Sequence, residues 1–332
     1  LKYVFQTKDD IFIFASSATG VMEAAVANFL SPFETAVIIE GGIWGRIWSE
    51  ICQGFNIKCE IIKVEEGRRL DIEILKNKLK ELDGKVKAVF ATLCETSTGV
   101  VFDIEAIGKV VKDTSAILIV DAAAGLGAID FKTDAWACDV VLTGSQKGLA
   151  SSPGLGIISV SPKALKLVEK SSCLRYYFDI KKALLAKEKS DTPFTPSISL
   201  IRGLIESLKI IKREGLENIF FRNRLLSQAI REGIKALGLE IFSSSDVLTS
   251  VNIPGSIDAE RLVVTLQSKY NIKIARGLGN LRGKIVRIGN IGSVDEYDIL
   301  ILIYSLEKVL TEMGHKFKPG EGITAVQREF SK

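Results

Sequence analysis

Short runs of apolar, mostly β-branched residues alternate with segments of helical periodicity through the first half of the chain. The runs predict strands at 10–14, 36–39, 58–64, 86–92, 117–120, 139–143 and 156–160. A strand–helix alternation of this kind predicts an α/β fold, a mostly parallel, doubly wound sheet with helices on both faces.

The rhythm changes after the two prolines of residues 191–196. A long helix is predicted from Ile198 to about Ile211, as a bridge between domains. From about residue 220 the pattern is typical of a smaller α+β layer, with strands at 247–253 and 284–288. We therefore expect a large domain over 1–220 and a small C-terminal domain over 221–332.

The strand predicted at 139–143 stops at a turn of small residues that presents Lys147, and the strand at 117–120 ends in Asp121. Carboxyl ends of parallel strands share one edge of the sheet, where ligands bind. A lysine amine and a carboxylate at that edge match what pyridoxal phosphate requires, an amine for its aldehyde and an acid for its pyridine nitrogen. A lone lysine can also be an ordinary solvated side chain.

Three further polar or aromatic positions follow predicted strands: the small-residue turn with Ser17 and Thr19, the glycine-flanked Trp44, and Thr96. A turn before a helix is a ready anion site, although Ser17 and Thr19 can simply cap the helix. Trp44 could offer a flat surface to an aromatic ligand or belong to the core. Their common place after strands favours a shared ligand site.

Arg287 stands in the apolar run Val286–Gly289, where its guanidinium needs a partner. That partner is either an internal carboxylate, in a salt bridge, or the carboxylate of a substrate, held by two parallel hydrogen bonds.

Composition excludes several function classes. The formal net charge of +4 is small and dispersed, which argues against nucleic-acid binding. Five cysteines form no CxxC pair, so neither a disulfide frame nor a metal site is predicted, and a cytoplasmic protein is expected. The Gly125-Leu126-Gly127 run lacks the third glycine of a nicotinamide-binding fingerprint. No apolar run is long enough to span a membrane.

Taken together, the motifs resemble the class V aminotransferases, the branch of fold-type I pyridoxal-phosphate enzymes that includes alanine–glyoxylate and serine–pyruvate aminotransferases. The matching segments follow the family's order along nearly the whole chain. They are Ser17–Thr19 with Met22–Ala25, Gly42–Gly45, Glu95–Gly99, Val120–Ala122, Thr143–Lys147, Pro153–Leu155, Thr192–Pro196 and Arg287–Gly289.

The resemblance implies a role for each central residue. Lys147 would attach the cofactor covalently and later move the Cα proton of the substrate. Asp121 would pair with the ring nitrogen, Trp44 would stack on the ring, and Thr96 would lie near the ring hydroxyl. Arg287 would bind the substrate carboxylate.

The resemblance also implies how the phosphate is bound and how the protein assembles. The residues around the phosphate would be Ser17, Ala18, Thr19 and Gln146. Thr192 or Thr195 would reach the phosphate of a partner subunit, so a homodimer is implied. The family usually has glycine where Ala18 stands. Its leading segment, with a glycine- and proline-rich substrate loop, is not seen ahead of Leu1. Three explanations are open: a truncated sequence, a numbering that starts at the first ordered residue, or a chain that lacks the loop.

The function implied is transfer of an amino group from alanine or serine to glyoxylate or pyruvate, without a metal. A lyase of the cysteine-desulfurase kind is an alternative, but such relatives typically stack a histidine on the ring, and the single histidine here is His315. A relative that has lost catalysis is a third possibility, and a nicotinamide dehydrogenase is the weakest.

Overall fold

The computed structural model describes all residues, 1–332, and its larger part is built on a seven-stranded sheet of order β1-β9-β8-β7-β4-β2-β3. Its strands are β1 (Asp10–Ala15), β2 (Thr35–Glu40), β3 (Lys58–Lys63), β4 (Val86–Thr92), β7 (Ile117–Asp121), β8 (Val140–Gly144) and β9 (Leu155–Val160). The predicted mostly parallel sheet is confirmed, with β9 antiparallel to both of its neighbours. A loop of ten residues without a helix joins β8 to β9, so the chain turns back without a crossover.

The inner strands of this sheet are buried on both faces because successive side chains enter two separate cores, whereas the edge strands β1 and β3 leave some side chains exposed. In β7, Ile117 and Ile119 belong to one core, and Leu118 and Val120 belong to the other. The first core is covered by α2 (Ala18–Phe29), α3 (Ile43–Gly54), α6 (Pro162–Val168) and α7 (Ile180–Glu188). The second is covered by α4 (Ile72–Glu81), α5 (Ile104–Lys112) and α8 (Ile198–Glu214). This is the doubly wound arrangement expected from the alternating pattern.

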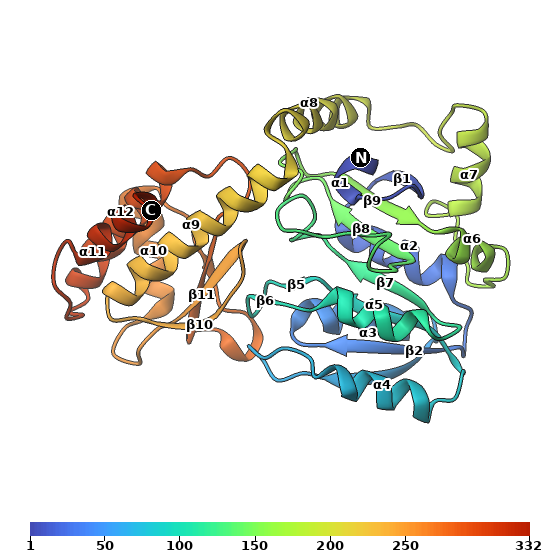
Figure 1. Cartoon of the computed structure of the whole chain (residues 1–332), viewed down its shortest axis with the longest axis horizontal. Helices are drawn as coiled ribbons and strands as arrows, with labels where there is room; N and C mark the ends of the chain where they lie inside the picture. The colour runs from blue at the N-terminus through green and yellow to red at the C-terminus, as the bar shows by residue number, and fades with distance from the viewer.

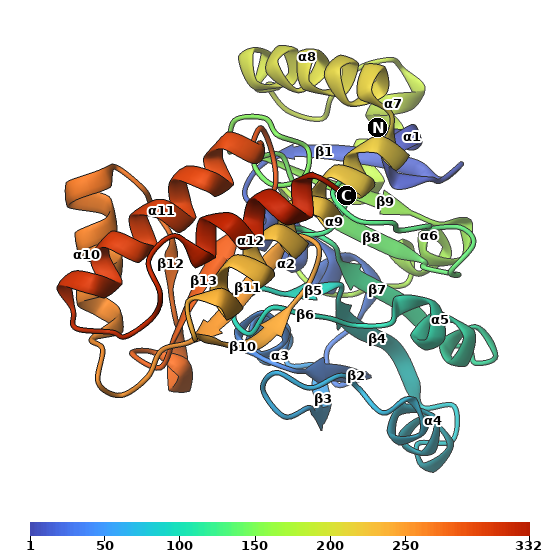
Figure 2. The same cartoon turned by 60° about the vertical axis from the view of Figure 1, so that its left-hand side comes forward.

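The C-terminal part contains a four-stranded antiparallel sheet of order β10-β11-β13-β12, seen in orange in Figure 1. Its strands are β10 (Glu240–Ser244), β11 (Leu248–Asn252), β12 (Ala275–Arg276) and β13 (Ile285–Gly289). Three helices pack with it around a third core, as Figure 2 shows from the side: α10 (Ala259–Tyr270), α11 (Glu296–Glu312) and α12 (Glu321–Phe330).

The helix α9 (Leu216–Ala236) joins the two parts of the molecule. Its first turns place Leu216 and Phe220 in the core of the large sheet, and its later turns place Leu226 and Ile230 in the third core. The bridge is therefore α9, and not the helix predicted from Ile198, because α8 packs only on the large sheet. The division at residue 220 falls inside α9 and stays a prediction.

The remaining elements are short, and the sequence pattern did not indicate them. They are α1 (Lys2–Phe5), β5 (Cys94–Glu95), β6 (Val100–Val101) and a 3₁₀ turn at Gly279–Leu281. No helix in the structure combines the length and the apolar character that crossing a bilayer would require.

Candidate functional site

A cavity of about 470 Å³ lies between the carboxyl edge of the large sheet and the C-terminal sheet, and we call it the interdomain cavity. It brings together four of the predicted site residues from distant parts of the chain. Its lining residues are Trp44, Thr96, Ala124, Lys147, Val247, Leu248, Lys273, Ile274, Ala275, Arg287, Gly289 and Ile291.

Lys147 reaches this cavity from the loop after β8, and it is half-buried without an ion-pair partner. Ser145 holds the loop in place: its hydroxyl donates to the carbonyl of Ser152 at 2.6 Å and accepts from the amide of Leu155 at 3.3 Å. The loop backbone is thus tied to the start of β9. The Lys147 amine itself has no ion-pair partner and is available to a ligand.

Asp121 ends β7, the neighbour of β8, and only 5% of its surface is exposed. Its carboxylate accepts one hydrogen bond, from the amide of Ala123 at 2.8 Å, and takes part in no ion pair. Burial raises the pKa of Asp121 to about 6; the Ala123 bond and Lys147 oppose this rise, and Glu95 adds to it. A buried carboxylate with so few partners is suited to a cationic N–H donor of a ligand.

Trp44 is oriented by the loop after β5. Its indole Nε1 donates to the Thr96 hydroxyl at 2.7 Å, and its amide donates to Oε1 of Glu95 at 3.3 Å. The other oxygen of Glu95 accepts from the amide of Gly45 at 3.0 Å. Glu95, whose side chain is fully buried, thus accepts from the first amides of α3, which have no partner within the helix.

Gly42, just before α3, permits this close approach. A Cβ at Gly42 would lie 2.3 Å from Oγ of Ser97 and 2.6 Å from the carboxyl carbon of Glu95. Glu95 was not among the predicted site residues, although its place directly after a buried strand was a signal that could have found it.

Arg287 lies in β13 of the C-terminal sheet and lines the interdomain cavity, whereas Lys147 reaches the same cavity from the large sheet. Its Nε donates to the carbonyl of Arg276 at 2.8 Å, and one Nη donates to the carbonyl of Thr96. Burial lowers the pKa of Arg287, and the charge of Glu95 opposes that shift. No carboxylate forms a salt bridge with Arg287, so the structure offers no partner for the internal ion-pair alternative.

The turn between β1 and α2 lies beside the loop that carries Lys147. Ser17 caps α2, and its side chain accepts from the amide of Gly20 at 3.4 Å, so the capping alternative is realised. Ala18 and the side-chain oxygen of Gln146 both lie over Gly144, at 3.4 and 2.6 Å from where a Cβ of that glycine would be. Thr19 and Gln146 are exposed at this helix N-terminus, a place that favours an anion.

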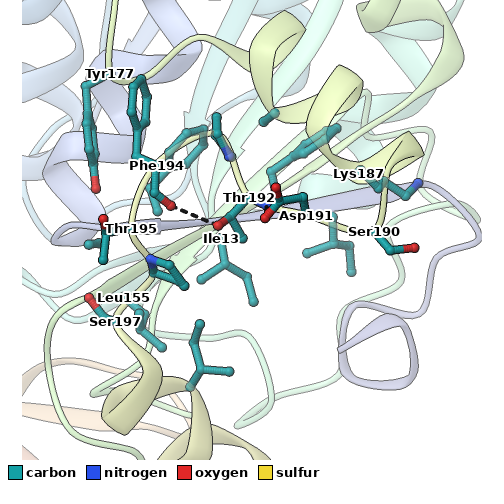
Figure 3. Close-up of a pocket in the computed structure, with 18 residues that line it drawn as sticks. Ile13, Leu155, Tyr177, Lys187, Ser190, Asp191, Thr192, Phe194, Thr195 and Ser197 are labelled. Atoms are coloured by element: carbon teal, nitrogen blue, oxygen red, sulfur yellow. Dashed lines mark hydrogen bonds between the residues drawn. The ribbon is translucent and has the colours of Figure 1, made fainter.

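Thr192 and Thr195 are not brought to the interdomain cavity. Both line a second cavity, of about 270 Å³, along the edge strand β1 (Figure 3). The Thr192 hydroxyl donates to the carbonyl of Phe194 at 2.8 Å, and the Phe194 ring stacks on Tyr177 with centroids 5.1 Å apart. Within one chain these threonines therefore contact neither Lys147 nor Asp121.

Lys273 is the lining residue that the sequence did not single out. It precedes β12, a strand of only two residues, which is too short to produce a periodic pattern. No group of three or more histidine, cysteine, aspartate or glutamate side chains lies close enough together to bind a metal ion.

Comparison with known proteins identifies the family to which the chain belongs. The family model described as aminotransferase class-V matches residues 1–285. The chain is 40% identical to the soluble hydrogenase 42 kDa subunit of Anabaena cylindrica, over 100% of this chain and 88% of that one. It is 32% identical to the L-aspartate–glyoxylate aminotransferase of Paracoccus denitrificans, over 99% and 85%. The solved ureidoglycine–glyoxylate aminotransferase of Bacillus subtilis superposes with a TM-score of 0.96 at 29% identity, covering 100% of this chain and 88% of that one.

Proposed function

Because the chain belongs to the class V aminotransferases, which are pyridoxal-phosphate-dependent transaminases, we propose that it transfers an amino group from a small amino acid to a small 2-oxo acid at the interdomain cavity. The observation that carries the proposal is that a free lysine, Lys147, and a buried, nearly unpartnered carboxylate, Asp121, follow adjacent strands. The lysine amine is suited to an aldehyde, and the carboxylate is suited to a ring N–H.

The residues present fit pyridoxal phosphate. Asp121 would hold the ring nitrogen, because its carboxylate has accepting capacity left and is shielded from water. Trp44, fixed by Thr96, would face the ring. The phosphate would bind at the N-terminus of α2, through Ser17, Ala18, Thr19 and Gln146. When bound, the cofactor supplies an electron sink for the negative charge that develops at the substrate Cα.

Lys147 would hold the cofactor through its aldehyde and would also serve as the base that takes the proton from the substrate Cα. The Ser145 bonds keep the backbone of this loop fixed, so the amine moves on its own side chain only. Asp121 stays ionised against the ring N–H and keeps that nitrogen charged.

Arg287 would bind the α-carboxylate of both amino acid and oxo acid. Two carbonyl oxygens, those of Thr96 and Arg276, already orient the guanidinium and leave N–H donors for a ligand. As expected from the sequence, we propose alanine or serine among the donors and glyoxylate or pyruvate as acceptor. Two relatives reported above are named for glyoxylate as acceptor, which supports that choice.

The proposal includes a homodimer in the cytoplasm. Thr192 and Thr195 are exposed away from their own chain's cavity, as residues that complete a partner's phosphate site would be. All five cysteines are free, which is compatible with a reducing compartment. We also propose that residues 1–220 and 221–332 form the two domains that enclose the cavity.

A desulfurase-type reaction has no supporting observation, since no cysteine lines the interdomain cavity. The experiment that tests the proposal is reconstitution with pyridoxal phosphate, borohydride reduction and peptide mass mapping. We expect the label on Lys147, with a visible absorption band that changes on addition of alanine or serine. Lys132→Ala, which removes a surface lysine paired with Asp130, is the control and should be labelled normally. Label on another lysine would overturn the proposal.

A further inference from the structure

Three cationic side chains and no acidic one line the interdomain cavity. They are Lys147, Arg287 and Lys273. The proposed function uses the first two, for the cofactor and for the substrate α-carboxylate. Lys273 has no part in it. It is an exposed residue of the lining, and a third cation in a cavity without an acidic side chain suggests a second anionic group on the ligand.

Lys273 differs from the other cations near the same sheet edge because it has no partner. Arg276 contacts Glu260 at 2.9 Å, and Arg282 contacts the same carboxylate at 3.8 Å. Lys273 takes part in none of the ion pairs or side-chain hydrogen bonds of the structure. Glu260 is thus occupied by arginines, and the Lys273 ammonium has no ion-pair partner at the cavity.

The register of the C-terminal sheet places Lys273 near Arg287. Ala275 of β12 is paired directly with Arg287 of β13, and Lys273 comes two residues before Ala275. Lys273, Ile274 and Ala275 all line the cavity, so the chain that leads into β12 runs along it. If the register of β12 is extended back by two residues, Lys273 falls diagonal to Arg287. Diagonal neighbours in a ladder are roughly 7–8 Å apart at their bases, within reach of long side chains.

Gly289 leaves room in the cavity beside Arg287. It follows Arg287 by two residues and also lines the cavity. A Cβ at Gly289 would have no neighbour closer than 3.8 Å, where the Leu248 side chain lies, and Gly289 itself contributes no side chain there. Two carboxylates of one short molecule could therefore contact both residues at once.

We propose that Lys273 determines substrate specificity by binding the side-chain carboxylate of a small dicarboxylic amino donor, of the size of aspartate, while Arg287 binds its α-carboxylate. The inference rests on the proposed function and extends it: a cavity with a further cation beside Arg287 favours an acidic donor over alanine or serine. A lysine that is merely solvated would leave donor choice unaffected by its removal.

The test compares the fully reconstituted wild-type protein with Lys273→Met, which keeps the length of the side chain and removes its charge. Lys284→Met is the matched control, since Lys284 is an exposed lysine next to β13 that does not line the cavity. Half-reaction rates are measured with aspartate, alanine and serine. We expect Lys273→Met to lower kcat/KM for aspartate by about 10- to 100-fold and for alanine by less than about threefold, the range for loss of one charge-assisted hydrogen bond. Lys284→Met should leave both values as in wild type.

A second readout requires no turnover. Succinate should raise the thermal midpoint of the wild-type protein more than propionate does, and Lys273→Met should abolish that difference. An unchanged aspartate-to-alanine ratio in Lys273→Met, with succinate still favoured over propionate, would overturn the inference. Failure of the proposed function looks different, because the wild-type protein would then bind no cofactor covalently and react with no donor.

Discussion

The guanidinium of Arg287 in β13 donates a hydrogen bond to the backbone carbonyl of Thr96, the residue whose hydroxyl accepts from the indole of Trp44. One residue of the large domain thus contacts both the proposed carboxylate-binding arginine and the proposed ring-stacking tryptophan. Thr96 therefore links the proposed substrate site to the proposed cofactor site.

Arg287→Lys should weaken transition-state binding by roughly 2–5 kcal/mol, the range for removing one member of a buried charge pair. A lysine cannot reproduce the planar fork that holds a carboxylate by two bonds. The loss should be similar for alanine and serine and absent for a simple amine without a carboxylate. Half-reaction rates and the thermal midpoint are the measurements, with Arg282→Lys as control. Lower stability with unchanged discrimination between acids and amines would contradict the assignment.

Asp121→Asn should retain some cofactor and lose most of its turnover. An amide cannot keep the ring nitrogen charged, and loss of such a preorganised charge costs on the order of a hundredfold or more in rate. Single-turnover kinetics with saturating cofactor measure the effect. Near-normal rates in the variant would show that another group holds the ring nitrogen.

The same carboxyl should make the stability of the cofactor-free protein depend on pH. Its folded-state pKa of about 6 lies above the value of 3.8 for an unperturbed aspartate, because burial disfavours the charge. The stabilising contribution of the protonated form is therefore complete below about pH 4 and is lost as the pH rises through 6, by up to about 3 kcal/mol.

Chemical denaturation of the cofactor-free wild type and of Asp121→Asn, from pH 4 to 7.5, gives the free energy of unfolding of each protein at each pH. The difference between the two proteins measures the pH-dependent contribution of Asp121. The difference should change across pH 4–6 and stay flat above about pH 7. Cofactor affinity of the wild type should rise over the same interval as the carboxylate forms. Parallel curves for the two proteins would refute the buried-carboxyl explanation.

Thr96→Val should weaken cofactor binding by about fivefold to tenfold, because the indole N–H of Trp44 loses its 2.7 Å acceptor and the ring loses its fixed orientation. The backbone carbonyl of Thr96 that accepts from Arg287 is retained in this variant. Binding of the α-carboxylate should therefore change little. Titration of the cofactor-free protein with pyridoxal phosphate gives the affinity. Wild-type affinity in the variant would show that Trp44 does not contribute to binding of the ring.

The large domain could be predicted from the sequence because its inner strands are buried on both faces and therefore appear as nearly continuous apolar runs. The turns that follow these runs then lie at one edge of the sheet, which is why position alone predicted Trp44, Thr96, Lys147 and Asp121 as candidates for one shared site. Arg287 was found for a related reason, as a charge inside an apolar strand.

Other features depend on interactions that no local pattern records. The reversal of β9 follows from a connection without a helix, and the bridging role of α9 follows from which core each of its turns enters. Glu95 is a helix cap supplied from 50 residues downstream of Gly45. Lys273 reaches the cavity from just before a two-residue strand, which is too short to have a period. The role proposed for Thr192 involves a second chain, which no local pattern records.

Thr192 and Thr195 provide the sharpest test of assembly. Both are exposed beside the edge strand β1, and neither lines the interdomain cavity of its own chain. If their hydroxyls complete a partner's phosphate site, the double variant Thr192→Val/Thr195→Val should bind cofactor weakly while its thermal midpoint without cofactor is unchanged. The control is Ser199→Ala. Ser199 is exposed and close in sequence to the threonines, but it does not line the cavity along β1.

Mixing two inactive proteins then separates the partner's role from a role within one chain. Lys147→Ala lacks the amine and keeps its threonines, and the double threonine variant has the opposite defect. A mixed dimer of the two would contain one site with both Lys147 and intact threonines, because the threonines come from the other subunit. We therefore expect activity to appear on mixing and to follow the fraction of mixed dimers, isolated with two affinity tags. If mixed dimers form and activity stays absent, or if the wild-type protein sediments as a monomer with full cofactor occupancy, the threonines do not act across a subunit interface.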